Sequence, residues 1–199
     1  MSYEGVRDGD LVAVVTFLEM RERPASAVCA SPLSLRHVEH PQHEHYRILF
    51  RKVGARWLWF SRLIMDDAKL AAIIDDGNVD LLTVLDESGS EVGMLELDFR
   101  EAGECELSFV GLVPELSGQG HGRWLLAEAV SRAWREGVTR VHVHTCTLDH
   151  PAALGAYRRA GFTPYKRAIE RFPDPRLLGI LPRNCAPQVP LLGTLASAP

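Results

Sequence analysis

The sequence lacks the features that define several large classes of protein. Its four cysteines form no C-x-x-C pair, which argues against a disulfide framework or a zinc knuckle and is typical of a reducing cytoplasm. No apolar run approaches the roughly 20 residues that a membrane-spanning helix needs. The first ten residues are too polar for a signal peptide. We therefore expect a cytoplasmic protein that has no membrane partner.

An excess of positive charge is also missing. The chain has 22 Lys and Arg residues against 26 Asp and Glu residues, which gives a formal net charge of -4. Nucleic-acid binding needs a basic face that contacts phosphates, so we expect no nucleic-acid partner. The 199 residues are 46% hydrophobic and 24% charged, a balance that fits one folded domain with a sizeable core.

Two common phosphate-binding loops are absent as well. A P-loop needs a Lys followed by Ser or Thr, and this pair does not occur in the chain. A dinucleotide-binding G-x-G-x-x-G is missing too, because Arg123 and Leu125 stand where its last glycine would be. The chain does contain a β-branched and aromatic stretch over 106–113, then Pro114, then S-G-Q-G-H-G over 117–122.

A helical pattern follows this glycine loop. Its apolar residues recur at spacings of three and four, and they are Leu125, Leu126, Ala129, Val130, Ala133 and Trp134. The glycines allow the backbone to turn tightly and to come close to a ligand. The N–H groups of the loop and of the first helical turn then point at one spot, with the positive end of the helix dipole behind them. This arrangement favours binding of a pyrophosphate.

A second motif, H-P-A-A-L-G-A-Y-R-R-A-G-F, lies over 150–162. It is similar to A-x-x-x-Y-x-x-x-G-F, and the glycine loop is similar to [QR]-x-x-G-x-[GA]. Both patterns are hallmarks of the GNAT superfamily, the general N-acetyltransferases. The two motifs stand in the family's order over about 106–167, so the chain resembles a bacterial-type, single-domain GNAT protein. Ser117 departs from the family's Gln or Arg, which removes a side-chain contact to phosphate but leaves the main-chain N–H groups.

The resemblance implies an α/β (α+β) fold with a mixed, mostly antiparallel sheet flanked by helices. The residue patterns predict strands over 11–20, 79–86, 91–100, 106–113, 139–147 and 162–171, the last broken by Pro164. They predict helices over 46–53, 65–74 and 152–159, and one of about thirteen residues after the glycine loop. This last helix is long enough for a parallel crossover. Asp149 is the predicted N-cap of the 152–159 helix.

The chain divides into an expected GNAT domain over 1–171 and a proline-rich tail over 172–199. Six of the twelve prolines lie in this tail, which excludes a regular helix or a central strand there. The tail also carries several leucines, so we expect it to extend along the body of the protein or along a second subunit. GNAT relatives are often dimers, and a homodimer is compatible with this apolar tail.

The resemblance implies acetyl-CoA as co-substrate and a set of residues that bind it. The glycine loop would hold the pyrophosphate mainly through main-chain N–H groups, and the main-chain groups of Leu112 and Val113 would pair with the pantetheine amides as an extra strand would. His150 stands where many relatives have an Asn that binds this arm. The predicted donor-binding residues are Leu112, Val113, Gly118, Gln119, Gly120, His121, Gly122, Arg123 and His150.

Transfer to an amine raises two proton problems. An ammonium of pKa about 10 must lose a proton, and a thiolate of pKa about 8.5 leaves more readily if it is protonated. Tyr157 stands at the position of the family's general acid. Glu106 stands where some relatives carry a general base, although burial must raise its pKa from about 4.3 or a water must relay the proton. The alternative bases are His144, Glu96 and Asp98.

Three further features belong to this picture. The resemblance implies that a main-chain N–H near Leu112 stabilises the oxyanion, and Gly111 is the candidate for a bulge that exposes it. The histidines over 37–45 have spacings that resemble metal ligands, but no acid or cysteine completes a zinc pattern. We expect a polar loop or helix start there, and no metal. The aromatic run over 57–60 either lines a cleft or packs under a helix.

The sequence therefore predicts an N-acetyltransferase. The resemblance implies that acetyl-CoA is attacked directly, in a ternary complex, by a primary amine of a small molecule or peptide. Acceptor-binding groups would come from residues 37–60 and from the tail. Two alternatives stay open: a catalytically silent acyl-CoA-binding or regulatory module, because Ser117 and His150 depart from the family pattern, and an acyltransferase that uses a longer acyl-CoA.

Overall fold

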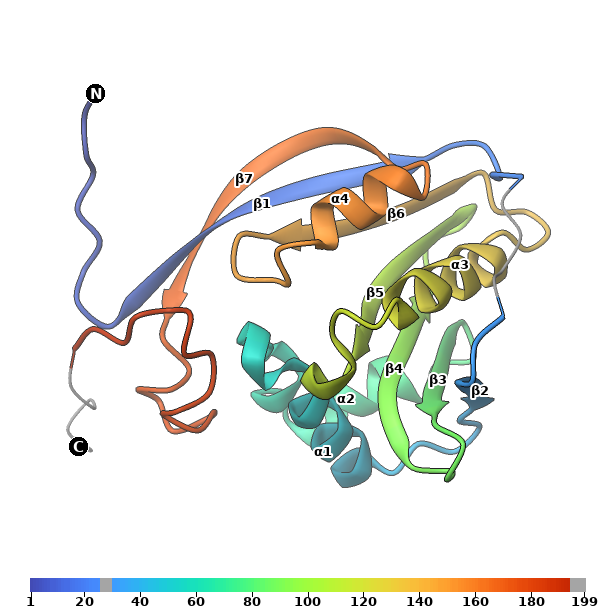
Figure 1. The fold of residues 1–199 in the computed structure, drawn as a ribbon, viewed down its shortest axis with the longest axis horizontal. Coiled ribbons are helices and arrows are strands. Elements are labelled where there is room, and N and C mark those ends of the chain that lie inside the picture. Colours follow the sequence, from blue (N-terminus) through green and yellow to red (C-terminus); the bar gives the residue numbers. More distant parts are fainter. Residues whose placement is uncertain (26–29, 194–199) are drawn as a thin grey trace.

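The computed structural model describes residues 1–25 and 30–193, and within them it contains a seven-stranded sheet with helices on both faces (Figure 1). The elements are, in chain order, β1 (Asp10–Met20), β2 (Ser34–His37), α1 (His43–Gly54), the 3-10 helices η1 (Ala55–Trp57) and η2 (Ser61–Leu63), α2 (Asp67–Ile74), β3 (Val79–Leu85), β4 (Glu91–Asp98), β5 (Glu104–Leu112), the 3-10 helix η3 (Pro114–Leu116), α3 (His121–Ala133), β6 (Arg140–Cys146), α4 (Ala153–Arg159) and β7 (Thr163–Pro173). The strand order is β2-β3-β4-β5-β6-β1-β7. Strands β5 and β6 pair in parallel, and the other described pairs are antiparallel, which confirms the predicted fold class.

Two apolar cores lie on opposite faces of the sheet. Helices α3 and α4 cover one face, where the predicted stripe of α3 packs on alternate residues of the central strands. Helices α1 and α2 cover the other face. The buried residues that α3 contributes are Trp124, Leu125, Leu126, Ala129, Val130 and Ala133. The sheet thus separates a glycine-loop side from a side formed by the N-terminal half of the chain.

The N-terminal strand lies inside the sheet. Strand β1 pairs with β6 over Val15–Met20 and with β7 over Asp10–Glu19, so that β1 and β7 run on together beyond the end of β6 (Figure 1). The expected break at Pro164 is wrong, because β7 is continuous and the ladder only shifts register between Phe17 and Leu18. An edge strand tolerates proline because the missing N–H needs no partner there.

Two further predictions concern the N-terminal half. The 34–37 segment, expected to be a loop or helix start, is the short edge strand β2, which pairs with β3. The predicted helix over 65–74 is confirmed as α2, with Asp66 as its N-cap accepting a hydrogen bond from the Lys69 N–H at 2.8 Å. Among the described residues, no helix is both long enough and apolar enough to cross a membrane.

Residues 174–193, here called the C-terminal segment, form turns that pack on the domain. Their centre is a buried ion pair in which Arg176 Nη2 lies 2.7 Å from Asp174 Oδ2. Arg176 Nη1 also donates to the carbonyl oxygen of Val189 at 2.8 Å. A buried guanidinium needs such partners, and here they gather the segment around it. The segment is therefore folded against the body and is not an extended tail.

Candidate active site

The parallel pairing of β5 and β6 is short. In the described part of the chain it covers Glu104–Glu106 on β5 and Arg140–His142 on β6. Beyond these residues β5 stays paired with β4, and β6 stays paired with β1. The second half of β5 therefore has one edge that the β6 ladder does not use.

At the end of β5, the main-chain N–H groups of successive residues point to opposite edges of the strand. The Val113 N–H donates to the carbonyl oxygen of Val92 at 2.9 Å, and the Val113 carbonyl accepts from the Leu116 N–H at 3.1 Å. The prediction that Val113 pairs with a pantetheine arm is therefore wrong for its N–H, which is already used. Because successive N–H groups of a strand point to opposite edges, the Leu112 N–H points to the edge on the β6 side.

A β-bulge is present, although not at the predicted position. Glu96 of β4 pairs with Phe109 and Leu97 pairs with Leu107, so Ser108 is the extra residue on β5. Gly111 has a different role: a Cβ there would lie 2.7 Å from Val53 Cγ1 and 2.9 Å from the Trp59 ring. Gly111 is thus required for close packing of the 54–60 segment on β5.

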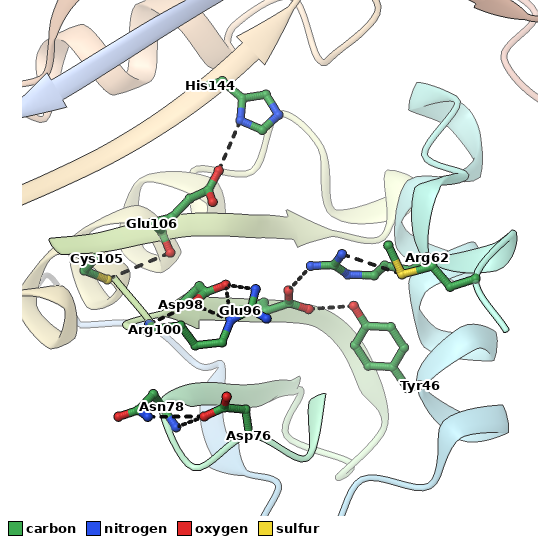
Figure 2. A network of polar contacts seen from close by, with 11 residues as sticks. Tyr46, Arg62, Asp76, Asn78, Glu96, Asp98, Arg100, Cys105, Glu106 and His144 are labelled. Carbon is green, nitrogen blue, oxygen red and sulfur yellow. Dashed lines mark hydrogen bonds and ion pairs between the residues drawn. The ribbon is translucent and has the colours of Figure 1, made fainter. Parts of the chain in front are cut away.

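Glu106 and His144 form a contact across the two strands (Figure 2). Glu106 Oε1 lies 3.3 Å from His144 Nδ1. This hydrogen bond lowers the pKa of Glu106, against the opposing effect of burial, and it raises the pKa of His144. The raised carboxyl pKa expected for a lone basic Glu106 is therefore not found. The unit that can exchange a proton here is the carboxylate–imidazole pair.

The two other candidate bases are occupied. Glu96 is fully buried, and its carboxylate accepts hydrogen bonds from Tyr46 Oη and Arg62 Nη2, each at 2.6 Å (Figure 2). Asp98 accepts from the Arg100 main-chain N–H and its guanidinium, and these bonds outweigh burial and lower the pKa of Asp98. Neither carboxylate is available to take a proton from an acceptor.

Sequence reasoning missed the partners of Glu96. Tyr46 lies on α1 and Arg62 on η2, 50 and 34 residues before it. Burial raises the pKa of Tyr46, so the phenol stays protonated and donates to the carboxylate. The available signal was an acidic residue among apolar neighbours on β4, because a buried carboxylate requires donors.

The glycine loop has the predicted conformation. Gly118 and Gly120 have φ values of 80° and 86°, which favour glycine, and Gly120 is the N-cap of α3. An added Cβ at Gly118, Gly120 or Gly122 would meet nothing within 4 Å, so the space before the loop is open. Gln119 Nε2 donates to the Glu115 carbonyl oxygen at 2.9 Å and braces the loop. The loop and the first turn of α3, with His121 and Arg123, fit an anionic group.

Tyr157 lies on α4, partly buried in the core between α3, α4 and the sheet. Its ring meets Phe162 edge-on, with centroids 5.8 Å apart. Burial raises the pKa of Tyr157, and the negative charge of Asp149 adds to this effect. The phenol therefore stays protonated across the neutral range, as a proton donor must.

The loop between β6 and α4 differs from its prediction. Asp149 is not the N-cap of α4, because its Oδ2 already accepts from Thr145 Oγ1 at 2.7 Å and from the Cys146 N–H at 2.8 Å. Its Oδ1 accepts from Trp59 Nε1 at 3.2 Å. His150 Nδ1 accepts from the Ala152 N–H at 3.1 Å, so this side chain braces the start of α4.

The N-terminal histidines have separate partners. His43 Nε2 lies 3.3 Å from Asp75, and His45 Nε2 lies 2.7 Å from Glu91. Across residues 1–25 and 30–193, no three His, Cys, Asp or Glu side chains gather in a group that could hold a metal ion.

Comparison with known proteins finds similar sequences and folds among acetyltransferases. A 90-residue stretch, 45% of the chain, is 31% identical to a mycothiol acetyltransferase of Jonesia denitrificans and covers 28% of that protein. A GCN5-related N-acetyltransferase of Sphaerobacter thermophilus has a similar fold, with a TM-score of 0.58, 20% identity, and coverage of 84% of this chain and 52% of that one. An aminoglycoside acetyltransferase from an uncultured soil metagenomic sample matches with a TM-score of 0.54, 18% identity, and coverage of 70% and 93%.

The chain thus spans about half of the Sphaerobacter protein and about a quarter of the Jonesia one. At these identities the likeness to the solved structures speaks for the fold. The model of the acetyltransferase (GNAT) family matches residues 36–162, well over half of the chain and the part that holds β5, the glycine loop and Tyr157. The chain therefore belongs to the GNAT family of acetyltransferases.

Proposed function

We propose that the protein is an N-acetyltransferase that moves the acetyl group of acetyl-CoA to a primary amine of a small molecule or peptide within a ternary complex. GNAT enzymes use acetyl-CoA. The observation that carries the proposal is the end of β5–β6 pairing at Glu106, with the open glycine loop following β5 and the Tyr157 helix following β6. Both GNAT motifs thus flank one opening in the sheet.

Donor binding in this proposal is mainly a main-chain task. The N–H groups of residues 118–123 face the pyrophosphate, helped by the dipole of the thirteen-residue helix α3. The exposed Arg123 adds a positive charge beside them. The Leu112 N–H, on the β6 side of β5, meets the acyl or pantetheine part as a further strand would. Bound acetyl-CoA supplies the acyl group as an activated thioester.

The leaving sulfur needs a proton, and Tyr157 is its source. The phenol of the partly buried Tyr157 is protonated at neutral pH, because its raised pKa keeps it uncharged. The phenolate formed after transfer regains a proton readily because burial disfavours its charge.

The acceptor amine must lose a proton, and the Glu106–His144 pair is its destination. Glu106 stays ionised and holds the imidazole, which takes the proton on Nε2 or through a water. The ionised carboxylate also favours a cationic acceptor by charge. This proposal replaces a lone glutamate base by the pair.

The test is amine-dependent release of CoA over a panel of primary amines. We expect Tyr157→Phe to lower kcat by about 10²–10⁴-fold with donor affinity kept. Tyr3→Phe, at an exposed tyrosine, is the control and should behave as wild type. Parallel loss of donor affinity would make Tyr157 structural. Donor binding without turnover would favour the silent module, and faster turnover with longer thioesters would identify a longer-chain acyltransferase.

A further inference from the structure

Leu58 has an unusual backbone conformation. Its φ of 58° and ψ of 32° are left-handed, and it follows the end of η1. The Leu58 N–H donates to the Ala55 carbonyl and the Trp59 N–H donates to the Gly54 carbonyl, a Schellman pattern in which Leu58 takes the place that glycine usually holds. A leucine is strained there, so its surroundings must hold it.

The C-terminal segment provides these surroundings. The Leu58 side chain is buried against Leu181 and Ala186. Ala186 also has a positive φ, of 50°, and it is the other non-glycine residue of the described chain with this property. The Ala186 carbonyl accepts from buried Arg176 Nη1 at 3.3 Å, and Gln188 Nε2 donates to the Arg56 carbonyl of η1 at 2.6 Å. The two residues with a left-handed backbone, Leu58 and Ala186, therefore lie together where the C-terminal segment packs against η1.

The neighbours of Leu58 reach the candidate active site. Trp57 meets the His150 ring with centroids 5.0 Å apart, and Trp59 Nε1 donates to Asp149. Trp59 also packs against β5, where its ring would lie 2.9 Å from a Cβ at Gly111 and its centroid lies 5.1 Å from that of Phe109. Trp59 thus bridges β5 and the loop that follows β6, beyond the last β5–β6 pair.

We propose that Trp59 is a strut that sets the separation of β5 and β6 in the active site, and that the C-terminal segment locks this strut through Leu58. The contacts run from Arg176 through Ala186, and from Leu181, to Leu58, and then through the adjacent Trp59 to Asp149. Leu58, Trp59 and Leu181 are positioning residues, since they act through Gly111 on β5, next to Leu112, and through Asp149, whose charge acts on Tyr157. The kinetic part of this inference rests on the acetyltransferase function proposed above.

The first test removes the contact between the C-terminal segment and Leu58 and leaves Trp59 unchanged. Leu181→Ala deletes the side chain that packs on Leu58, whereas Leu177→Ala makes the same change in the same segment, where the side chain packs near Gly9. Leu181 and Leu177 are 3% and 7% exposed, so both changes cost stability. Measured well below both unfolding temperatures, Leu181→Ala should lower kcat and raise the KM for acetyl-CoA, together reducing kcat/KM by about tenfold or more.

Leu177→Ala should keep kcat and KM within about twofold of wild type, and Leu181→Met, which refills the volume, should restore most of the loss. Equal kinetics for the two alanine variants would overturn the proposal. Any change in kcat/KM would then come from the loss of stability that both variants share, and not from the contact of Leu181 with Leu58. Trp59→Phe, which deletes the bond to Asp149, should reproduce the Leu181→Ala kinetics.

A second readout does not depend on catalysis. The chain has four tryptophans, and their indole N–H groups give separate NMR signals, with Trp59 assigned from its Phe variant. Leu181→Ala should shift the Trp59 signal and speed its exchange with solvent, and Leu177→Ala should leave both unchanged. An unchanged Trp59 signal in Leu181→Ala would refute the claim that the C-terminal segment holds Trp59 in place through Leu58. If the NMR result holds while wild type binds no acetyl-CoA, the proposed function fails and the strut stands.

Discussion

The buried ion pair between Arg62 and Glu96 gives a stability prediction with a definite size. Arg62 and Glu96 side chains are 12% and 0% exposed, and they meet at 2.6 Å. Arg62→Met keeps the length and apolar stem but removes the charge, which leaves the Glu96 carboxylate buried with only the Tyr46 hydroxyl. Loss of one partner of a buried pair costs about 3–5 kcal/mol. For a chain of this size, the unfolding temperature should fall by roughly 6–20 °C.

The matched control is Arg100→Met. Arg100 pairs with Asp98 at 2.5 Å, but these side chains are 38% and 11% exposed, so solvent limits the loss to about 1 kcal/mol or less. Urea unfolding followed by circular dichroism measures both variants. The triple change of Tyr46→Phe, Arg62→Met and Glu96→Leu, which removes every charge and donor, should regain most of the stability. An Arg62→Met loss no larger than that of Arg100→Met would refute the reasoning.

Two further predictions concern the donor loop and the proton-accepting pair. Gly120→Glu should weaken acetyl-CoA binding by at least about 100-fold, through strain at a φ of 86° and charge repulsion, while Gly137→Glu, at an equally open glycine with a φ of 84°, should bind normally in calorimetry. In Glu106→Gln the carboxylate that most raises the pKa of His144 is gone, so that pKa falls although Asp149 and Glu170 still raise it. In the proposed mechanism the neutral imidazole of His144 accepts the proton. The acidic limb of the plot of kcat against pH should therefore move to lower pH. His144 ring NMR titrations check the same direction, and a limb that moves to higher pH would contradict the pair.

Much of this architecture could be predicted from the sequence. The 106–113 strand, the glycine loop and the helix after it carry strong local signals, namely β-branched residues, glycines and an apolar stripe at spacings of three and four. The parallel crossover from β5 to β6 followed from the length of that helix. The short strand β2 had no such signal, because its residues are mostly polar and it is held by pairing with β3 at the sheet edge.

The contacts that define the site depend on tertiary structure. Asp149 precedes a proline and a helix, a local pattern typical of an N-cap, yet the end of β6 and Trp59 supply competing donors. Gly111 was expected to form a bulge because glycine weakens a strand, but the approach of Trp59 from another part of the chain explains it. The pKa of Glu106 likewise depends on His144, which lies 38 residues further along the chain, on the neighbouring strand β6.

The most direct test of the central claim is thermal unfolding with and without acetyl-CoA. At about a hundred times its dissociation constant the donor adds ~2.7 kcal/mol to the free energy of unfolding, a shift of roughly 5–10 °C. The account predicts this shift with acetyl-CoA, its absence with NAD or ATP, and its loss in Gly120→Glu. No shift with any CoA thioester would contradict the account, because the open glycine loop would then not be a donor site.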